Sequence, residues 1–225
     1  MDKKIIIMSD LYGQQHRTLQ HAFDTEKLAD AVQSNIVSTE LADEHQGFIA
    51  SRDMFFLSTL DHRGYPTCSY KGGSPGFVKI LDSQTLAFPS YDGNGMFLSM
   101  GNITTHPQIG MLFIDFETPH RVRVHGTAIT ETSSALLSQF PGADMIVTVK
   151  ITEVFINCTR YIHKYQRVES SNYVPQANCS TPFAQWKRID NLQDSLPERD
   201  KHIATTLGGT ITTEQYVEMV IQGKA

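Results

Sequence analysis

The stretch MFFLSTLDHRGYPTCSYKGG, residues 54–73, decides the fold. Its first seven residues are strand formers, and the polar DHRG that follows ends in glycine, as a β-hairpin connection does. In the second strand, side chains alternate between the two faces, which puts Thr67, Ser69 and Lys71 together. Cys68 then lies on the opposite face, where we expect it in the core. The hairpin therefore has one face that combines small polar side chains with a cation.

A second run, DGNGMFLSMGNI at residues 92–103, carries the other half of the expected site. Gly93 and Gly95 remove side-chain bulk just before a helix that we expect from about residue 96 to residue 105, where Pro107 stops it. A glycine-bearing loop that enters a helix exposes backbone N–H groups and a positive dipole end, which suits an anion. Asn94 and Ser99 could add neutral donors. Together, the two runs predict a pocket for a phosphorylated cofactor.

The other strand-like segments extend this hairpin into a sheet. They span residues 77–81, 85–89, 108–115, 121–128 and 145–156, joined by short connections without strand–helix–strand alternation. This pattern predicts a mainly β, α+β protein: an antiparallel six-stranded split β-barrel with flanking helices. In residues 121–128 the alternation places Arg121, Arg123 and His125 on one face.

Both ends of the chain differ from the barrel in their residue pattern. Leu19, Phe23 and Leu28 indicate a helix from Thr18, and residues 39–52 indicate a second, so that residues 1–52 form an arm and a helical lid. Residues 53–157 form the barrel. Residues 158–225 form a tail that packs on the barrel or on a partner, and it ends in a helix over residues 207–223 that Thr212 or Thr213 caps.

Composition narrows the classes of protein. The net charge of -5 at pH 7 argues against a nucleic-acid binder. Three widely spaced cysteines and scattered histidines (His106, His125 and His163) indicate a reducing compartment and no metal site. The apolar run at residues 5–8 is too short for a signal peptide, and no segment reaches the roughly 20 apolar residues of a membrane helix. We expect a cytoplasmic protein that does not bind membranes.

The ordered set of these motifs resembles one family. The matching residues are FFLSTLD with GYP, SYKGG with GFV, LAFP, DGNGM, GNI, HP, and LFID leading to RVRVHG, with NC and RYIH in the tail. Over residues 48–131 the chain is similar to the pyridoxamine 5'-phosphate oxidase-like flavoproteins, the FMN-binding split barrels. The resemblance implies a homodimer with FMN at the subunit interface and an oxidoreductase that transfers hydride or electrons to or from a small molecule.

The resemblance also implies site residues. Ser69 and Lys71 match the strand that contacts the FMN phosphate and ribityl chain, and the loop before the helix matches the phosphate loop. The candidates for cofactor binding are Ser69, Tyr70, Lys71, Asn94, Gly95, Met96, Ser99, Asn102, Arg121 and Arg123. Residues 96–99 hold no Arg or Lys where the oxidases of the family carry a basic pair, so the resemblance implies flavin binding without implying pyridoxamine phosphate oxidation. Lys71, Arg121 or Arg123 are the candidates to supply that charge.

Other readings stay open from the sequence. Lys71 could be a solvated barrel residue, and Arg121 and Arg123 could form an exposed face or interface ion pairs. No side-chain nucleophile or catalytic residue can be assigned, which agrees with chemistry performed by a bound flavin. The alternatives to an enzyme are a protein that binds flavin or tetrapyrrole without turnover, and an empty barrel that serves as a dimeric interaction module.

Overall fold

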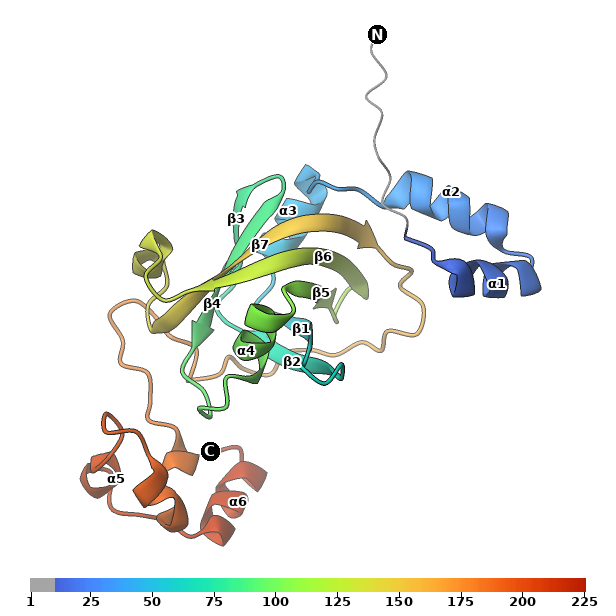
Figure 1. The fold of residues 1–225 in the computed structure, drawn as a ribbon. Coiled ribbons are helices and arrows are strands. Elements are labelled where there is room, and N and C mark those ends of the chain that lie inside the picture. The colour runs from blue at the N-terminus through green and yellow to red at the C-terminus, as the bar shows by residue number, and fades with distance from the viewer. Residues whose placement is uncertain (1–10) are drawn as a thin grey trace. The chain divides into compact units, whose positions relative to one another are not determined.

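The computed structural model describes residues 11–225, and the chain divides into two compact units, Met1–Glu169 and Ser170–Ala225. The first unit holds the β-sheet with helices α1 to α4, and the second holds short helical segments (Figure 1). The division into residues 1–52, 53–157 and 158–225 stays a prediction. The apolar run at residues 5–8, on which part of the expected localisation rests, lies outside the described residues.

Residues 11–225 form one antiparallel sheet of seven strands in the order β2-β1-β5-β6-β7-β4-β3. The strands are β1 (Met54–Leu60), β2 (Pro66–Gly72), β3 (Lys79–Asp82), β4 (Thr85–Tyr91), β5 (Gln108–Asp115), β6 (His120–Glu131) and β7 (Ala143–Ile156). The predicted fold class, a split barrel with flanking helices, is confirmed. The sheet has one strand more than the six expected because every predicted strand segment forms a strand, the short β3 included. No pairing closes the barrel between β2 and β3 in this part of the chain.

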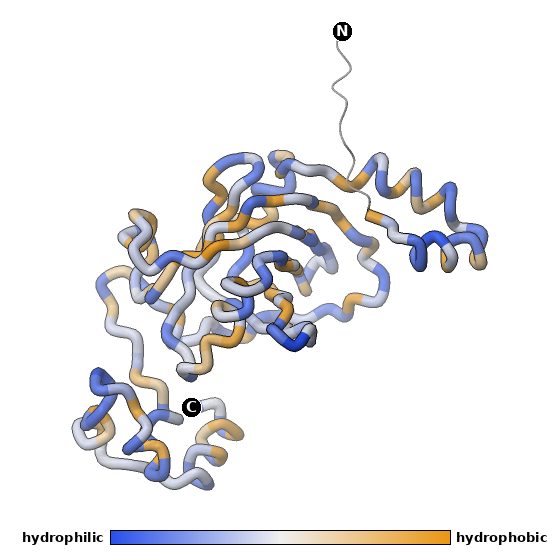
Figure 2. Tube along the Cα trace, viewed as in Figure 1, coloured by the Kyte–Doolittle hydropathy of each residue, from blue (hydrophilic) through white to orange (hydrophobic). Residues whose placement is uncertain are grey.

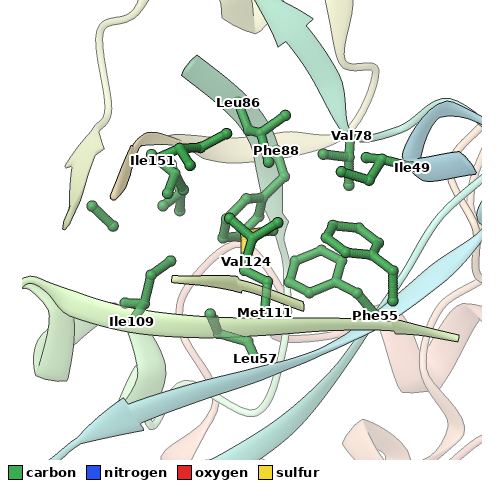
Figure 3. Close-up of a cluster of buried hydrophobic side chains, with 14 of the residues drawn as sticks. Ile49, Phe55, Leu57, Val78, Leu86, Phe88, Ile109, Met111, Val124 and Ile151 are labelled. Carbon is green, nitrogen blue, oxygen red and sulfur yellow. The ribbon is translucent and has the colours of Figure 1, made fainter. Parts of the chain in front are cut away.

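The core lies on the inner face of this curved sheet. Along β1, Phe55 and Leu57 are fully buried and point inward, and Figure 3 shows them among side chains from β4, β5 and β6. The Phe55 ring lies 5.0 Å from that of Phe88 and 5.2 Å from that of Phe113, within the range in which aromatic pairs add to the stability that burial provides. The period-2 pattern of the sequence therefore sets which face of each strand carries the core.

Local chemistry fixes the turn between β1 and β2 and the ladder between β6 and β7. The Asp61 carboxylate, at the turn between β1 and β2, accepts hydrogen bonds from the backbone N–H groups of Arg63 and Tyr65 and pairs with the Arg63 guanidinium at 2.6 Å. The ladder between β6 and β7 shifts register between His125 and Gly126. A Cβ at Gly126 would lie 2.6 Å from the Lys150 carbonyl oxygen, so only glycine fits there.

The N-terminal helices are α1 (Gln14–Ala22), α2 (Glu26–Ile36) and α3 (Asp43–Ala50). The single helix expected from Thr18 is therefore wrong: Asp24, at φ 53°, turns the chain between α1 and α2. Figure 2 shows hydrophobic residues interspersed along both helices, and Phe23 is 75% exposed. In α3, by contrast, His45 and Ile49 are buried.

The second unit contains the short helices η2 (Gln185–Arg188), η3 (Asp190–Ser195) and α5 (Ile203–Thr206), and ends with α6 (Thr213–Ile221). The predicted cap of α6 is confirmed, because the Thr212 side chain accepts from the Gln215 backbone N–H. Lys187 and Asp200, both buried, pair at 2.7 Å. A 3₁₀ turn, η1 (Ala135–Gln139), joins β6 to β7 in the first unit.

Residues 11–225 contain neither a membrane-spanning helix nor a metal-binding cluster. None of their helices combines the length and apolar character that a membrane crossing needs. Nor do they bring together three or more His, Cys, Asp or Glu side chains in a metal-binding arrangement.

Candidate functional site

The polar face of β2 lies on the inner side of the sheet. Lys71 is paired with Phe55 of β1, Ser69 with Leu57 and Thr67 with Thr59, and directly opposed residues project to the same side. The predicted alternation along β2 therefore holds, and it directs Ser69 and Lys71 toward helix α4 (Leu98–Thr105), which packs against β1 and β6.

Two hydrogen-bonded contacts join this strand to α4. The hydroxyl oxygens of Ser69 and Ser99 lie 3.0 Å apart, which connects the middle of β2 to the first turn of the helix. Deeper in, the Asn102 amide donates to the hydroxyl oxygens of Thr59 at 3.0 Å and Thr67 at 3.3 Å. Asn102 is only 7% exposed. Two contacts that span 30 and 35 residues of the chain thus bring the sequence-predicted residues Ser69, Ser99 and Asn102 to one place.

The loop that enters α4 leaves the helix start open. Gly95 has φ 77° and Phe97, the residue before the helix, has φ 49°, and no side chain caps the first N–H groups. The Asn94 side chain accepts from the Met96 backbone N–H at 3.1 Å, so it stabilises the turn itself. Uncapped N–H groups at a helix start offer donors and a positive dipole end to an anion.

Lys71 supplies a cation beside these groups. Its side chain is partly buried, and burial lowers the pKa of its ammonium group from the ordinary value. No hydrogen bond or ion pair within residues 11–225 uses that group. A partly desolvated cation without a counter-charge favours binding of an anion, because the anion replaces the water that burial removed. We call Lys71, Ser69, Ser99 and the loop residues 93–97 the α4 cradle.

The remaining predicted residues lie on the outer face of the sheet. Tyr70 projects outward from β2, with its ring 6.2 Å from that of Phe56. Arg121 and Arg123 project outward from β6, and an Arg121 Nη donates to the Cys158 carbonyl oxygen at 3.0 Å. The structure therefore does not bring the two arginines onto the face that carries Lys71. Cys68 is also on the outer face and exposed, so its expected place in the core is wrong, because only the inner face of β2 meets the core.

A pocket of about 630 Å³ opens on this outer face, and we call it the outer pocket. It is lined by Phe56, Ser58, Thr59, Leu60, Pro66, Cys68, Gln108, Ile109, Gly110, Met111, Leu112, Arg123, His125, Gly126, Thr127, Thr152 and Glu153. Most of the lining is apolar, and Arg123, His125 and Glu153 contribute polar side chains to it. A pocket of this size, largely apolar with a few convergent polar groups, is typical of small-molecule sites.

One polar pair in the outer pocket was missed by sequence analysis. The His125 Nδ1 lies 2.9 Å from a carboxylate oxygen of Glu153, and both side chains line the pocket. The alternation of β6 placed His125 on the same face as Arg123, but His125 was not among the predicted site residues. Only the register between β6 and β7, shifted at Gly126, shows that Glu153 opposes it.

Comparison with known proteins identified a family. The sequence profile of the pyridoxamine 5'-phosphate oxidase family matches residues 41–157, just over half of the chain. The comparison with curated proteins gave no match.

Among solved structures, HupZ of Group A Streptococcus is 16% identical with a TM-score of 0.44, over 56% of this chain and 99% of HupZ. A candidate pyridoxamine 5'-phosphate oxidase of Lactobacillus delbrueckii is 22% identical with a TM-score of 0.44, over 52% of this chain and 95% of its own. HutZ, a heme storage protein of Vibrio cholerae, is 19% identical with a TM-score of 0.37, over 52% of this chain and 94% of HutZ.

Proposed function

The chain belongs to the pyridoxamine 5'-phosphate oxidase family, and on that premise we propose that it is an FMN-dependent oxidoreductase that acts on a small molecule. The observation that carries the proposal is the α4 cradle. Lys71 lacks a counter-charge, and the helix start beside it lacks a cap. A phosphate monoester meets both needs at once, since it accepts hydrogen bonds from the ammonium group and from backbone N–H groups.

The chain's own residues then have separate tasks. Lys71 and Ser69 hold the phosphate from β2, and Ser99 and the N–H groups of the first turn of α4 hold it from the helix. Asn94 and Gly95 shape the loop, since the Asn94 side chain bonds its own turn and Gly95 takes a left-handed conformation. Asn102 is buried and bonded to two threonines, so it acts by holding α4 against β1 and β2.

Exposed apolar residues at the cradle support a homodimer. Met96, Phe97 and Leu98 are 61%, 53% and 55% exposed, and they follow one another directly before and at the start of α4. A contiguous exposed apolar surface next to a ligand site is a frequent mark of a protein–protein contact. We propose that a second copy covers this surface and completes the cofactor site.

Bound FMN would supply the hydride or electron transfer. Its ring would contact Arg121 and Arg123, two of the candidates for cofactor binding, only if it extends past the edge strand β2 to the outer face, where both arginines lie. Tyr70 lies on that same face of β2. There a cation would stabilise negative charge on the reduced ring.

The test compares FMN with riboflavin, which lacks the phosphate. Titration of the purified protein, followed by flavin fluorescence, should show that Lys71→Ala weakens FMN binding about ten-fold or more, the effect of losing one charge-assisted contact. Riboflavin binding should change little. Lys150→Ala, which removes an exposed cation from β7, is the matched control and should leave both affinities unchanged. If the Lys71 variant loses affinity for FMN and for riboflavin equally, Lys71 does not contact the phosphate.

Turnover requires a second measurement. Anaerobic addition of NADH or NADPH to the FMN-loaded protein should bleach the flavin spectrum, and air should restore it. A loaded protein that neither nicotinamide bleaches would favour the alternative, a flavin-binding protein without turnover. Tetrapyrrole binding, the other form of that alternative, would appear as a heme spectrum on titration with hemin and no affinity for FMN.

A further inference from the structure

The outer pocket presents a cation and a paired imidazole beside an apolar floor, on the face of β2 opposite the α4 cradle. We propose that this pocket binds an aromatic carboxylate that also carries a hydroxyl group, with Arg123 holding the carboxylate and His125 the hydroxyl. Three features support this: Arg123 lacks an acidic partner, His125 pairs with Glu153, and an apolar pocket lies between Arg123 and His125.

Arg123 is a partly buried cation that lacks an acidic partner. Its guanidinium lies 5.6 Å from the centre of the Phe155 ring, and no ion pair within residues 11–225 includes it. Burial and the charge of neighbouring Arg121 both lower the pKa of Arg123. Two like charges side by side with little solvent are destabilising unless an anion joins them. The planar guanidinium matches a carboxylate, to which it donates two parallel hydrogen bonds.

His125 is oriented by a carboxylate. In the tautomer whose Nδ1 carries the proton, the His125 ring donates to Glu153 across the observed 2.9 Å. The Nε2 atom is then an acceptor. Its neighbouring carbon, Cδ2, faces Gly110, a pocket residue at which an added Cβ would lie 3.8 Å from that carbon. A ligand hydroxyl beside Gly110 can then donate to Nε2, the ring atom next to this carbon.

The spacing of these groups defines the ligand. Arg123 and His125 are two residues apart on one strand, so their positions are separated by roughly 7 Å along β6. That is about the length of one aromatic ring system with substituents at opposite ends. The floor includes Phe56 and Leu112, which offer apolar contact to the ring faces. A volume of about 630 Å³ leaves room for two or three fused rings.

This proposal names the substrate class of the oxidoreductase, and in that role it rests on the proposed function. The binding itself does not. It is measured on flavin-free protein, so a failure here and a failure of FMN binding or of nicotinamide bleaching are separate results.

Three fluorescent probes, which differ in whether they carry the hydroxyl and the carboxylate, test the pocket. They are 6-hydroxy-2-naphthoate, with both groups, 2-naphthoate, which lacks the hydroxyl, and 2-naphthol, which lacks the carboxylate. On the full-length wild-type protein we expect 6-hydroxy-2-naphthoate to bind about ten-fold more tightly than either of the others, because each omission leaves one polar group of the pocket without a partner. Equal affinities for the three probes, or no binding at about 1 mM, would overturn the proposal.

Two variants must then give crossed results. Arg123→Gln should weaken the binding of both carboxylate probes about ten-fold and leave the affinity for 2-naphthol unchanged. His125→Phe should remove the advantage of 6-hydroxy-2-naphthoate over 2-naphthoate and leave 2-naphthoate itself unchanged. A folding defect would lower all three affinities together, so the crossed pattern separates binding from stability. Lys150→Gln serves as the control for a lost cation on the same sheet. If it weakens the probes as much as Arg123→Gln does, or if either pocket variant affects all probes equally, the assignment is wrong.

Discussion

Replacement of Asn102 by alanine should loosen α4 from the sheet by an amount that the structure allows us to estimate. The Asn102 amide donates to Thr59 and Thr67, whose hydroxyl oxygens also lie 2.7 Å from each other. The variant loses one buried and one partly buried hydrogen bond, while the two threonines keep the contact between them. At about 0.5–1.5 kcal/mol for each bond, the free energy of unfolding should fall by about 1–3 kcal/mol. For a unit of this size, that corresponds to a fall in Tm of about 2–4 °C per kcal/mol.

The assay is thermal unfolding followed by circular dichroism, together with an FMN titration of the same sample. Asn102→Ala should lower Tm and weaken FMN less than Lys71→Ala does, since Asn102 only positions the helix that bears Ser99. Thr104→Ala removes an exposed hydroxyl that bonds within α4 and is the matched control, with an expected change below about 0.5 kcal/mol. If Asn102→Ala also changes the free energy of unfolding by less than about 0.5 kcal/mol, the inferred anchoring role of the amide is refuted.

Three further predictions concern other parts of the fold. Gly126→Ala should destabilise the first unit by about 1–3 kcal/mol in urea unfolding, because the new methyl group would lie 2.6 Å from the Lys150 carbonyl oxygen; an unchanged midpoint would show that the bulge can relax. At Asp61, burial favours the protonated form, but hydrogen bonds from the next turn outweigh it and lower the pKa from 3.8 to about 2. The carboxylate therefore stabilises the fold above pH 4 and progressively less as the pH falls toward 2, so the Tm difference between wild type and Asp61→Asn should shrink over that range; a constant difference would contradict this linkage. In the second unit, Lys187→Met leaves the buried Asp200 carboxylate without its ammonium partner and should cost about 3–5 kcal/mol, whereas the double variant Lys187→Met/Asp200→Leu should recover most of the loss in limited proteolysis; equal sensitivity of the two variants would exclude the pair as the cause.

Local pattern was sufficient for the strands and for the helix at the cradle. Alternation in residues 67–71 assigned Lys71 and Ser69 to one face because the side-chain period of a strand is independent of its partners. The same rule failed for Cys68, since alternation tells which residues share a face but not which face meets the core. The helix from Thr18 was predicted whole because hydrophobic spacing continues across Asp24, although the backbone reverses there.

The outer pocket could not have been predicted, because it depends on register. Gly110 opens its floor only because β5 lies between β1 and β6, and Glu153 reaches His125 only because the bulge at Gly126 shifts the β6–β7 ladder. Each of these contacts joins residues many positions apart in the chain. A single sequence contains the side chains but not the pairing that brings them together.

The two sites share a strand but not its side chains. Since successive residues of β2 face opposite ways, Cys68 lines the outer pocket while Ser69 faces the α4 cradle, and neither can contact the ligand of the other site directly. Thr59 is the exception, because it borders the pocket and also accepts a hydrogen bond from Asn102. Apart from direct contact between the two ligands, an effect of a pocket ligand on the affinity for phosphate would pass through backbone shifts of β1 and β2 or through this threonine. The Asn102 variant would remove the second route and leave the first.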